Sequence, residues 1–144
     1  EKGVRPDFII DETFYKKTYN QNQILGRALM ESNLLLDRKI IFSAIKKKDM
    51  DFYGIESGDL DGVIDQLRVT EGVECALFLY EKVEGQFKVS LRSNGNVDVR
   101  KIAENFGGGG HVRAAGCTVD GNVRDIVNNI TPFIEQQLKQ EKSV

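Results

Sequence analysis

The sequence is poor in residue types on which many catalytic and structural sites depend. It contains no tryptophan, one histidine, two cysteines and two prolines in 144 residues. The cysteines lie too far apart for a metal-binding spacing, and two of them do not form a disulfide framework. No Gly-x-Ser-x-Gly segment provides the usual nucleophile of a Ser-His-Asp triad. We therefore expect a chain that binds a ligand and is not a complete catalyst by itself.

Long apolar runs and a strong charge of either sign are missing as well. The longest apolar run, Cys75–Tyr80, has six residues, far fewer than the roughly 20 that a membrane span needs. The net charge of −2 excludes a globally basic nucleic-acid-binding protein. Because no secretory leader is recognisable, we expect a cytoplasmic location and no membrane partner. The first residue is Glu, so we expect the chain to be a piece of a longer protein.

Helical and strand patterns alternate along the chain, which predicts an α/β fold with a mixed β-sheet flanked by helices. Residues 5–32 have a helical pattern and are expected to form an N-terminal helical linker. Residues 40–45 and 73–80 are apolar on both faces and predict buried strands. Residues 86–93 alternate apolar and polar side chains, as a half-buried strand does. Turns are expected at Asp37-Arg38 and at Glu84-Gly85.

Three further helices follow from apolar residues at helical spacing. Ser57 is predicted to cap a helix with Leu60, Val63, Ile64 and Leu67 on one face. Asp98 is predicted to cap a second one, in which Val99, Ile102, Ala103 and Phe106 share a face. A short strand over 117–119 and a final helix over 123–138, bent at Pro132, complete the chain.

The segment Gly107–Gly110, followed by His111 and Arg113, is the most informative one. Four consecutive glycines let the backbone point successive N–H groups into one concavity, which is a nest for an anion. The imidazole and the guanidinium next to it can donate hydrogen bonds to phosphate oxygens. The alternative is that the glycines only allow a helix to pack tightly on a sheet.

The charge around this segment supports an anion site. Residues 88–113 carry a net charge of +3 within an acidic chain. Arg92 lies on the polar face of the strand over 86–93, where it either contacts the anion or is simply solvated. Arg100 and Lys101 are expected to be exposed residues of a helix. The acidic residues between Asp49 and Asp65 fit helix capping better than metal binding.

One segment resembles a known family closely. Phe106-Gly-Gly-Gly-Gly-His-Val-Arg-Ala-Ala-Gly116 is similar to the C-terminal signature of the DHH-family phosphoesterases, in their DHH-associated domain. Val89-Ser-Leu-Arg-Ser93 resembles the approach to that signature. Two further segments are similar to the oligoribonuclease and 3′-phosphoadenosine-5′-phosphate (pAp) phosphatase branch. One runs from Asp61-Gly62 through Arg68 and continues with Glu71-Gly72-Val73-Glu74. The other, Ile24-Leu-Gly-Arg-Ala-Leu29, resembles the linker helix of that branch.

The resemblance implies that the whole protein has two domains, one for catalysis and one for substrate binding. The family's N-terminal domain holds two divalent metals, usually manganese, with a consecutive Asp-His-His that this sequence lacks. Residues 1–32 are then the linker from a missing catalytic domain, and residues 33–144 are the substrate-binding domain. Arg92, Gly107–Gly110 and His111 would hold the phosphate and bases of the substrate. Arg113 is a further candidate, although the family motif is looser there.

Several functions remain open at this point. The parent enzyme would hydrolyse short oligoribonucleotides, pAp or linear dinucleotides, and it could be a homodimer. A similar domain forms the C-terminal part of alanyl-tRNA synthetases, so a non-catalytic RNA-binding module is the alternative. A nucleotide-sensing domain without a hydrolase partner is a third possibility.

Overall fold

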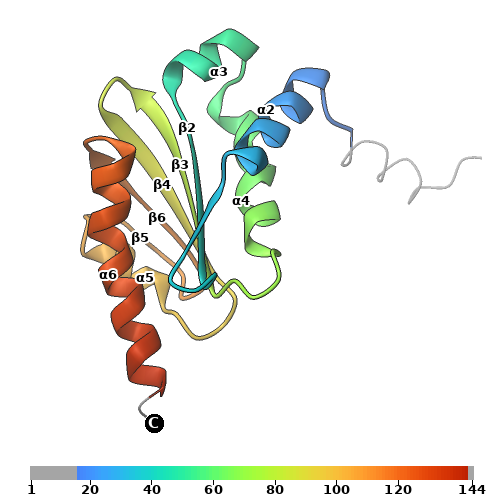
Figure 1. Ribbon diagram of the computed structural model, residues 1–144. Coiled ribbons are helices and arrows are strands. Elements are labelled where there is room, and N and C mark those ends of the chain that lie inside the picture. Colours follow the sequence, from blue (N-terminus) through green and yellow to red (C-terminus); the bar gives the residue numbers. More distant parts are fainter. Residues whose placement is uncertain (1–15, 143–144) are drawn as a thin grey trace, which may run out of the picture.

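The computed structural model describes residues 16–142 and has a six-stranded sheet with helices on both faces (Figure 1). The strand order is β1-β2-β3-β4-β6-β5. Strands β2 and β3 are parallel and all other neighbours are antiparallel, so the sheet is mixed, as predicted. The strands are β1 (Asn33–Leu35), β2 (Ile40–Ile45), β3 (Cys75–Val83), β4 (Gln86–Ser93), β5 (Gly109–Gly110) and β6 (Ala114–Asp120).

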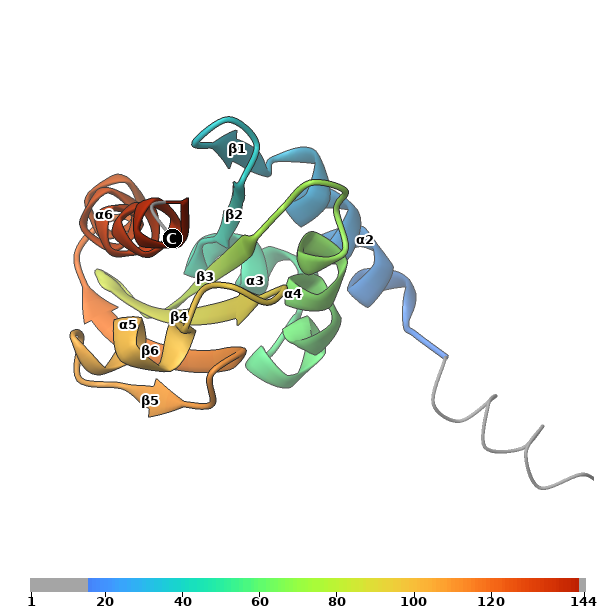
Figure 2. The ribbon, with the colours of Figure 1, turned by 90° about the horizontal axis from the view of Figure 1, so that it is seen from below.

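The helices form two layers, one on each face of the sheet (Figure 2). One layer consists of α5 (Val99–Glu104) and α6 (Val123–Lys142). The other consists of α2 (Tyr19–Met30), α3 (Lys47–Tyr53), the 3-10 helix η1 (Ser57–Leu60) and α4 (Asp61–Arg68). In residues 16–142 no helix combines the length and the hydrophobicity needed to cross a bilayer.

Alternation along the strands divides the core into two clusters. Leu77 and Leu91 belong to the cluster under α5 and α6, whereas Ala76 and Phe78 belong to the cluster under α2 and α4. In β4 every second residue is buried, which confirms the predicted alternation. The other residues of β4 face the layer of α4, and this side of the strand is where the candidate site lies.

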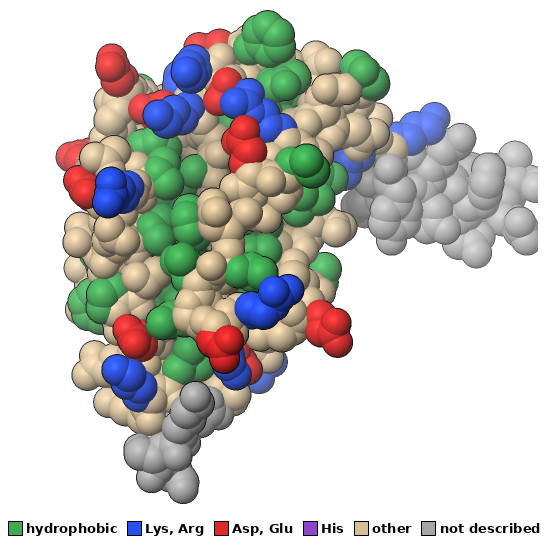
Figure 3. All heavy atoms as spheres, viewed as in Figure 1, with side chains coloured by type: hydrophobic (Ala, Val, Ile, Leu, Met, Phe, Trp, Pro, Cys, Tyr) green, Lys and Arg blue, Asp and Glu red, His purple; other side chains and the backbone are tan. Residues whose placement is uncertain are grey.

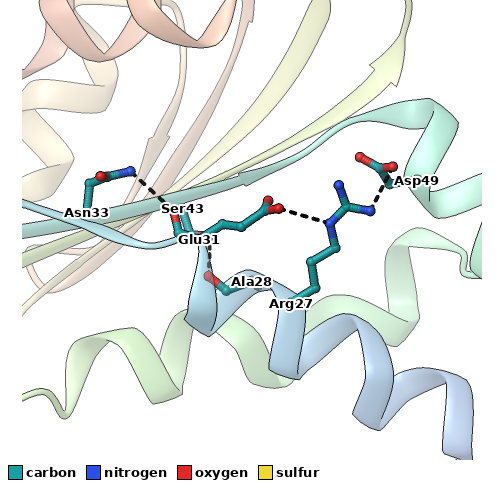
Figure 4. A network of polar contacts seen from close by, with 6 residues as sticks. All are labelled: Arg27, Ala28, Glu31, Asn33, Ser43 and Asp49. Carbon is teal, nitrogen blue, oxygen red and sulfur yellow. Dashed lines mark hydrogen bonds and ion pairs between the residues drawn. The ribbon is translucent and has the colours of Figure 1, made fainter.

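The N-terminal helix packs on the same sheet as the rest of the chain. Its residues Ile24 and Ala28 are fully buried, as their helical spacing predicts. The buried hydroxyl of Ser43 in β2 donates a hydrogen bond of 2.6 Å to the carbonyl oxygen of Ala28 (Figure 4). The predicted helix is thus confirmed over 19–30, whereas residues 16–18 are not helical, Thr18 being the N-cap, and residues 5–15 of the prediction lie outside the described residues. The division into a linker over 1–32 and a domain over 33–144 remains a prediction.

Two local features differ from the sequence prediction. Helix α3 was not expected, and its seven residues contain few apolar side chains. Ser57 does not cap a helix but begins η1, where the carboxylate of Asp59 accepts a hydrogen bond of 3.0 Å from the backbone N–H of Glu56. The apolar residues assigned to this helix are nevertheless buried, namely Leu60, Val63, Ile64 and Leu67.

Other predicted turns and caps are confirmed. Gly85 has φ +79° in the turn between β3 and β4. Leu36, Asp37 and Arg38 all have positive φ, so three left-handed residues close the hairpin of β1 and β2. The side chain of Asp98 accepts hydrogen bonds of 3.0 and 3.2 Å from the first backbone N–H groups of α5. This cap fixes the start of the helix that leads into the glycines.

Both cysteines are buried free thiols. Burial raises the pKa of Cys75 to about 12 and also raises that of Cys117. A thiol with a raised pKa is a poor nucleophile, so both residues act as small core side chains.

Candidate functional site

The glycine segment runs from the end of α5 into the edge strand β5. The backbone N–H of Gly107 donates to the carbonyl of Glu104 at 3.3 Å, and that of Gly108 donates to Ala103 at 2.9 Å. These bonds close the C-terminal turn of α5. The amides that sequence analysis assigned to an anion nest are therefore already used here by the helix end.

Pairing with β6 occupies most of the remaining amides. His111 and Ala114 exchange backbone hydrogen bonds of 2.7 and 3.2 Å, and Gly109 lies opposite Gly116. In an antiparallel ladder, residue pairs that exchange backbone hydrogen bonds alternate with pairs that exchange none. Gly110 and Ala115 form a pair of the second kind, so the N–H and C=O of Gly110 point away from β6, at the outer edge of the sheet. The helix end thus uses the amides of Gly107 and Gly108, and pairing with β6 leaves that of Gly110 at the outer edge, so the four amides do not form one concavity; the binding role of the glycines stays a prediction.

Two of the glycines are required by close packing. A Cβ on Gly108 would overlap the carbonyl oxygen of Gly116 and lie 2.7 Å from the Cβ of Cys117. A Cβ on Gly110, where φ is +144°, would lie 2.6 Å from the Cα of Ala115. Tight packing, the alternative considered above, accounts for both glycines.

The strand register places His111 and Arg92 on one row of the sheet. Ala114 lies opposite Arg92 of β4 on one side and exchanges backbone hydrogen bonds with His111 on the other. Residues directly opposite one another on neighbouring strands share a face, so both side chains belong to the face that carries α4. The two predicted residues, 19 positions apart in the sequence, are thus brought together by β6.

Arg113 joins Arg92 at one end of this face, whereas His111 does not line the hollow that the two arginines share. A hollow of about 320 Å³ contains Arg92 and Arg113 together with Arg68, the last residue of α4. Its remaining lining residues are Asp65, Ser93, Asn94 and Ala114. The backbone carbonyl of Arg113 accepts a hydrogen bond of 2.9 Å from Ser93, which fixes the turn carrying Arg113 to the end of β4.

The three guanidinium groups form no ion pair within residues 16–142, although the carboxylate of Asp65 lines the same hollow. Arg92 donates to the carbonyl oxygen of Leu91 at 3.1 Å, and Arg68 donates to the side-chain oxygen of Asn94 at 3.3 Å. Among residues 16–142, Arg68, Arg92 and Arg113 take part in none of the ion pairs. Each is at least partly accessible to solvent, so the hollow is a positively charged and open surface.

Sequence analysis did not identify Arg68 as a site residue. A basic residue in the last turn of a helix is explained well enough by the helix dipole, so its type gave no functional signal. Arg68 lies at the end of β4 only because α4 packs on that strand in the folded chain. Arg100 and Lys101 are exposed on α5, as expected, and neither lines this hollow.

A second hollow shares Arg92 with the first. It has a volume of about 280 Å³ and lies between the start of α4 and the middle of β3 and β4. It combines the aromatic side chains of Phe78 and Tyr80 with the polar groups of Lys88, Ser90 and Asp61. The face therefore has a cationic end and an amphipathic end, with Arg92 between them.

A third hollow lies elsewhere and has a different character. It is lined by Leu36 and Leu138, between the first hairpin and α6, in a region where hydrophobic side chains form a band (Figure 3). Its charged residues carry both signs and do not select an anion, namely Asp37, Lys39, Glu74, Glu135 and Lys139. In residues 16–142 no three His, Cys, Asp or Glu side chains form a group that could hold a metal ion.

Known proteins resemble this chain in sequence and in structure. A segment of 63 residues is 46% identical to the bifunctional oligoribonuclease and PAP phosphatase NrnA of Thermus thermophilus, covering 44% of this chain and 19% of that protein. The crystal structure of an exopolyphosphatase-related protein from Bacteroides fragilis matches with a TM-score of 0.79 and 24% identity, over 99% of this chain and 41% of that one.

A smaller domain has a similar fold. The C-Ala domain of Aquifex aeolicus alanyl-tRNA synthetase matches with a TM-score of 0.51 and 15% identity, over 76% of this chain and 98% of that domain. The present chain spans less than half of the two longer proteins. Residues 37–140, most of the chain, match the DHHA1 domain, and the chain therefore belongs to the DHHA1 domain family, close to the oligoribonuclease and pAp phosphatase branch.

Proposed function

We propose that this chain is the substrate-binding domain of a DHH-type phosphoesterase that acts on short oligoribonucleotides, pAp or linear dinucleotides. The observation that carries the proposal is the row formed by His111, Ala114 and Arg92, which ends beside Arg113 in a hollow without a compensating ion pair within residues 16–142. Guanidinium groups bind phosphate oxygens in a bidentate manner, and an imidazole can donate a further hydrogen bond.

The glycines have a different part in this proposal from the one that the sequence indicated. Gly107 has φ +79° at the end of α5, and Gly108 and Gly110 let β5 lie against β6. The N–H of Gly110 lies at the outer edge of β5, on the side away from β4, so it does not face the hollow of Arg92 and Arg113. The phosphate in that hollow would thus be bound by side chains.

The amphipathic hollow fits the nucleoside part of such a substrate. The ring of Tyr80 offers an apolar surface for a base, and the carboxylate of Asp61 and hydroxyl of Ser90 offer hydrogen-bonding groups. Because Arg92 lines both hollows, a phosphate bound there would leave the attached nucleoside next to Tyr80. A short nucleotide could then lie along β4.

Hydrolysis in the parent protein is assigned to another domain. Two divalent metals, expected to be manganese, would activate the attacking water there and stabilise the charge on the phosphate. The residues of this chain would bind and orient the nucleotide against that domain. We propose the oligoribonuclease-like activity for the whole protein and only the binding function for this chain.

The alternative function, binding of a folded RNA as a non-catalytic module, is less well supported. The similarity to the C-Ala domain is 15% in sequence and concerns the fold. A net charge of −2 also gives little long-range attraction to a large polyanion. A dinucleotide needs only the local cations at the end of β4.

The proposal can be tested by titrating this chain with the linear dinucleotide pApA and with a tRNA. We expect binding of pApA, weakened about tenfold or more by Arg92→Gln because a charge-assisted hydrogen bond is lost. Arg124→Gln is the matched control, since Arg124 is exposed on α6 and lines none of the three hollows. Binding of tRNA but not pApA, or an Arg92→Gln variant with unchanged affinity, would contradict the proposal.

A further inference from the structure

Arg68 and Asn94 hold each other by hydrogen bonds in both directions. The Asn94 side-chain amide donates to the carbonyl of Arg68 at 2.9 Å, and its oxygen accepts from Nη1 of Arg68 at 3.3 Å. The same amide donates to Val73 at 2.7 Å, while the backbone N–H of Asn94 donates to Glu74 at 3.0 Å. Asn94 is therefore fixed to the segment between the end of α4 and the start of β3, and it positions the guanidinium of Arg68.

This arrangement puts a third cation at the end of a site that already has two. Arg68, Arg92 and Arg113 line the hollow with a single carboxylate, Asp65, so the charged side chains around it sum to about +2. A phosphodiester carries one negative charge, whereas a phosphate monoester carries about −1.5 to −2 at pH 7. The charge of the hollow matches the monoester better than the diester.

We propose that Arg68, positioned by Asn94, binds a terminal phosphate monoester of the substrate and so makes the domain selective for phosphorylated nucleotide ends. This inference rests on the proposed function, because it assumes that a nucleotide lies along β4. It adds a specificity-determining residue outside the glycine segment and the row of His111 and Arg92. Asp65 repels a dianion more strongly than a monoanion, so the preference must come from the three arginines.

The test compares two dinucleotides that differ only in the terminal phosphate. The dissociation constants of ApA and pApA are measured for this chain at pH 7.5 by calorimetry or by chemical-shift titration. We expect pApA to bind about tenfold more tightly or better, as one additional charge-assisted interaction provides. Lowering the pH to 5 protonates the monoester, whose second pKa is about 6, and should reduce the preference.

Variants then assign the preference to Arg68. Arg68→Gln should bring the two dissociation constants close together while leaving that of ApA unchanged, and Asn94→Ala should act in the same direction. Arg124→Gln should preserve the preference. If Asn94→Ala unfolds the chain, as judged by circular dichroism, Arg68→Gln alone decides the question.

The possible failures are distinguishable. Equal affinity for ApA and pApA in the unmodified chain, or a preference that persists in Arg68→Gln, would overturn the inference and leave the proposed function standing. Equal weakening of both ligands by Arg68→Gln would also overturn it, because Arg68 would then act as a general cation. Absence of binding by either dinucleotide would contradict the proposed function itself, and the inference with it.

Discussion

Ser43 and Ala28 join the N-terminal helix to the centre of the sheet through a buried hydrogen bond of 2.6 Å (Figure 4). The carbonyl of Ala28 lies near the end of α2, where helix carbonyls lose their regular partners. Arg27, one residue earlier, pairs with Asp49 at 2.8 Å and with Glu31 at 3.2 Å. The helix is therefore attached to β2 and α3 by its last turn.

We expect Ser43→Ala to lower the free energy of unfolding by about 1–3 kcal/mol, because the carbonyl of Ala28 is left without a partner in a buried position. Urea unfolding followed by circular dichroism measures the change. Ser57→Ala is the matched control and should be close to neutral, since Ser57 is exposed. An unchanged unfolding midpoint for Ser43→Ala would show that this hydrogen bond does not contribute to stability.

The contact between β5 and β6 predicts opposite outcomes for two neighbouring glycines. Gly108→Ala should destabilise the chain strongly, by more than about 2 kcal/mol, because the added Cβ overlaps the backbone of Gly116. Gly109→Ala should be tolerated, since a Cβ there meets nothing within 4 Å. Thermal unfolding of both variants tests this prediction. Equal stability of the two variants would contradict the packing role of Gly108.

Acid should weaken the attachments made by two carboxylates. Hydrogen bonds from the backbone N–H groups of Gly85 and Lys47 lower the pKa of Glu81. The backbone N–H of Glu56 and the side-chain amide of Gln21 lower the pKa of Asp59 in the same way. A pKa that is lower in the folded than in the unfolded chain stabilises the fold above the ordinary carboxyl pKa. That stabilisation is lost as the pH falls below about 4, the range in which unfolded carboxylates titrate.

Urea unfolding between pH 7 and pH 3 measures this loss. Glu81→Gln should lower stability at pH 7 and flatten its dependence on acid, because the amide oxygen is a weaker acceptor that does not titrate. Glu84→Gln, in the same hairpin, is the control and should leave the acid dependence as it is. A pH profile of Glu81→Gln that matches the unmodified chain would show that Glu81 does not contribute.

The sequence predicts those parts of the fold in which local pattern and burial agree. The alternation of β4, the cap at Asp98 and the apolar face of α4 are all set by side chains close together in the sequence. The short helix α3 was not predicted, and the turn predicted at Asp37-Arg38 has three left-handed residues, Leu36–Arg38, that their residue types do not favour.

The candidate site is predictable only in part for a similar reason. The residue types of His111, Arg92 and Arg113 indicated an anion, but their common face depends on β6 lying between β4 and β5. The glycines were assigned to anion binding because spacing does not show which carbonyls accept their amides. Arg68 could not be found at all, since α4 meets β4 only after folding.

The central claim is that a short nucleotide binds along β4 between the two hollows that share Arg92. It is tested most directly by recording the backbone and arginine side-chain N–H signals of the ¹⁵N-labelled chain during a titration with pApA. We predict shifts at Arg92 and Arg113, and none at Arg124. Shifts confined to the hollow of Leu36 and Leu138 beside α6, or no shifts at millimolar pApA, would contradict it.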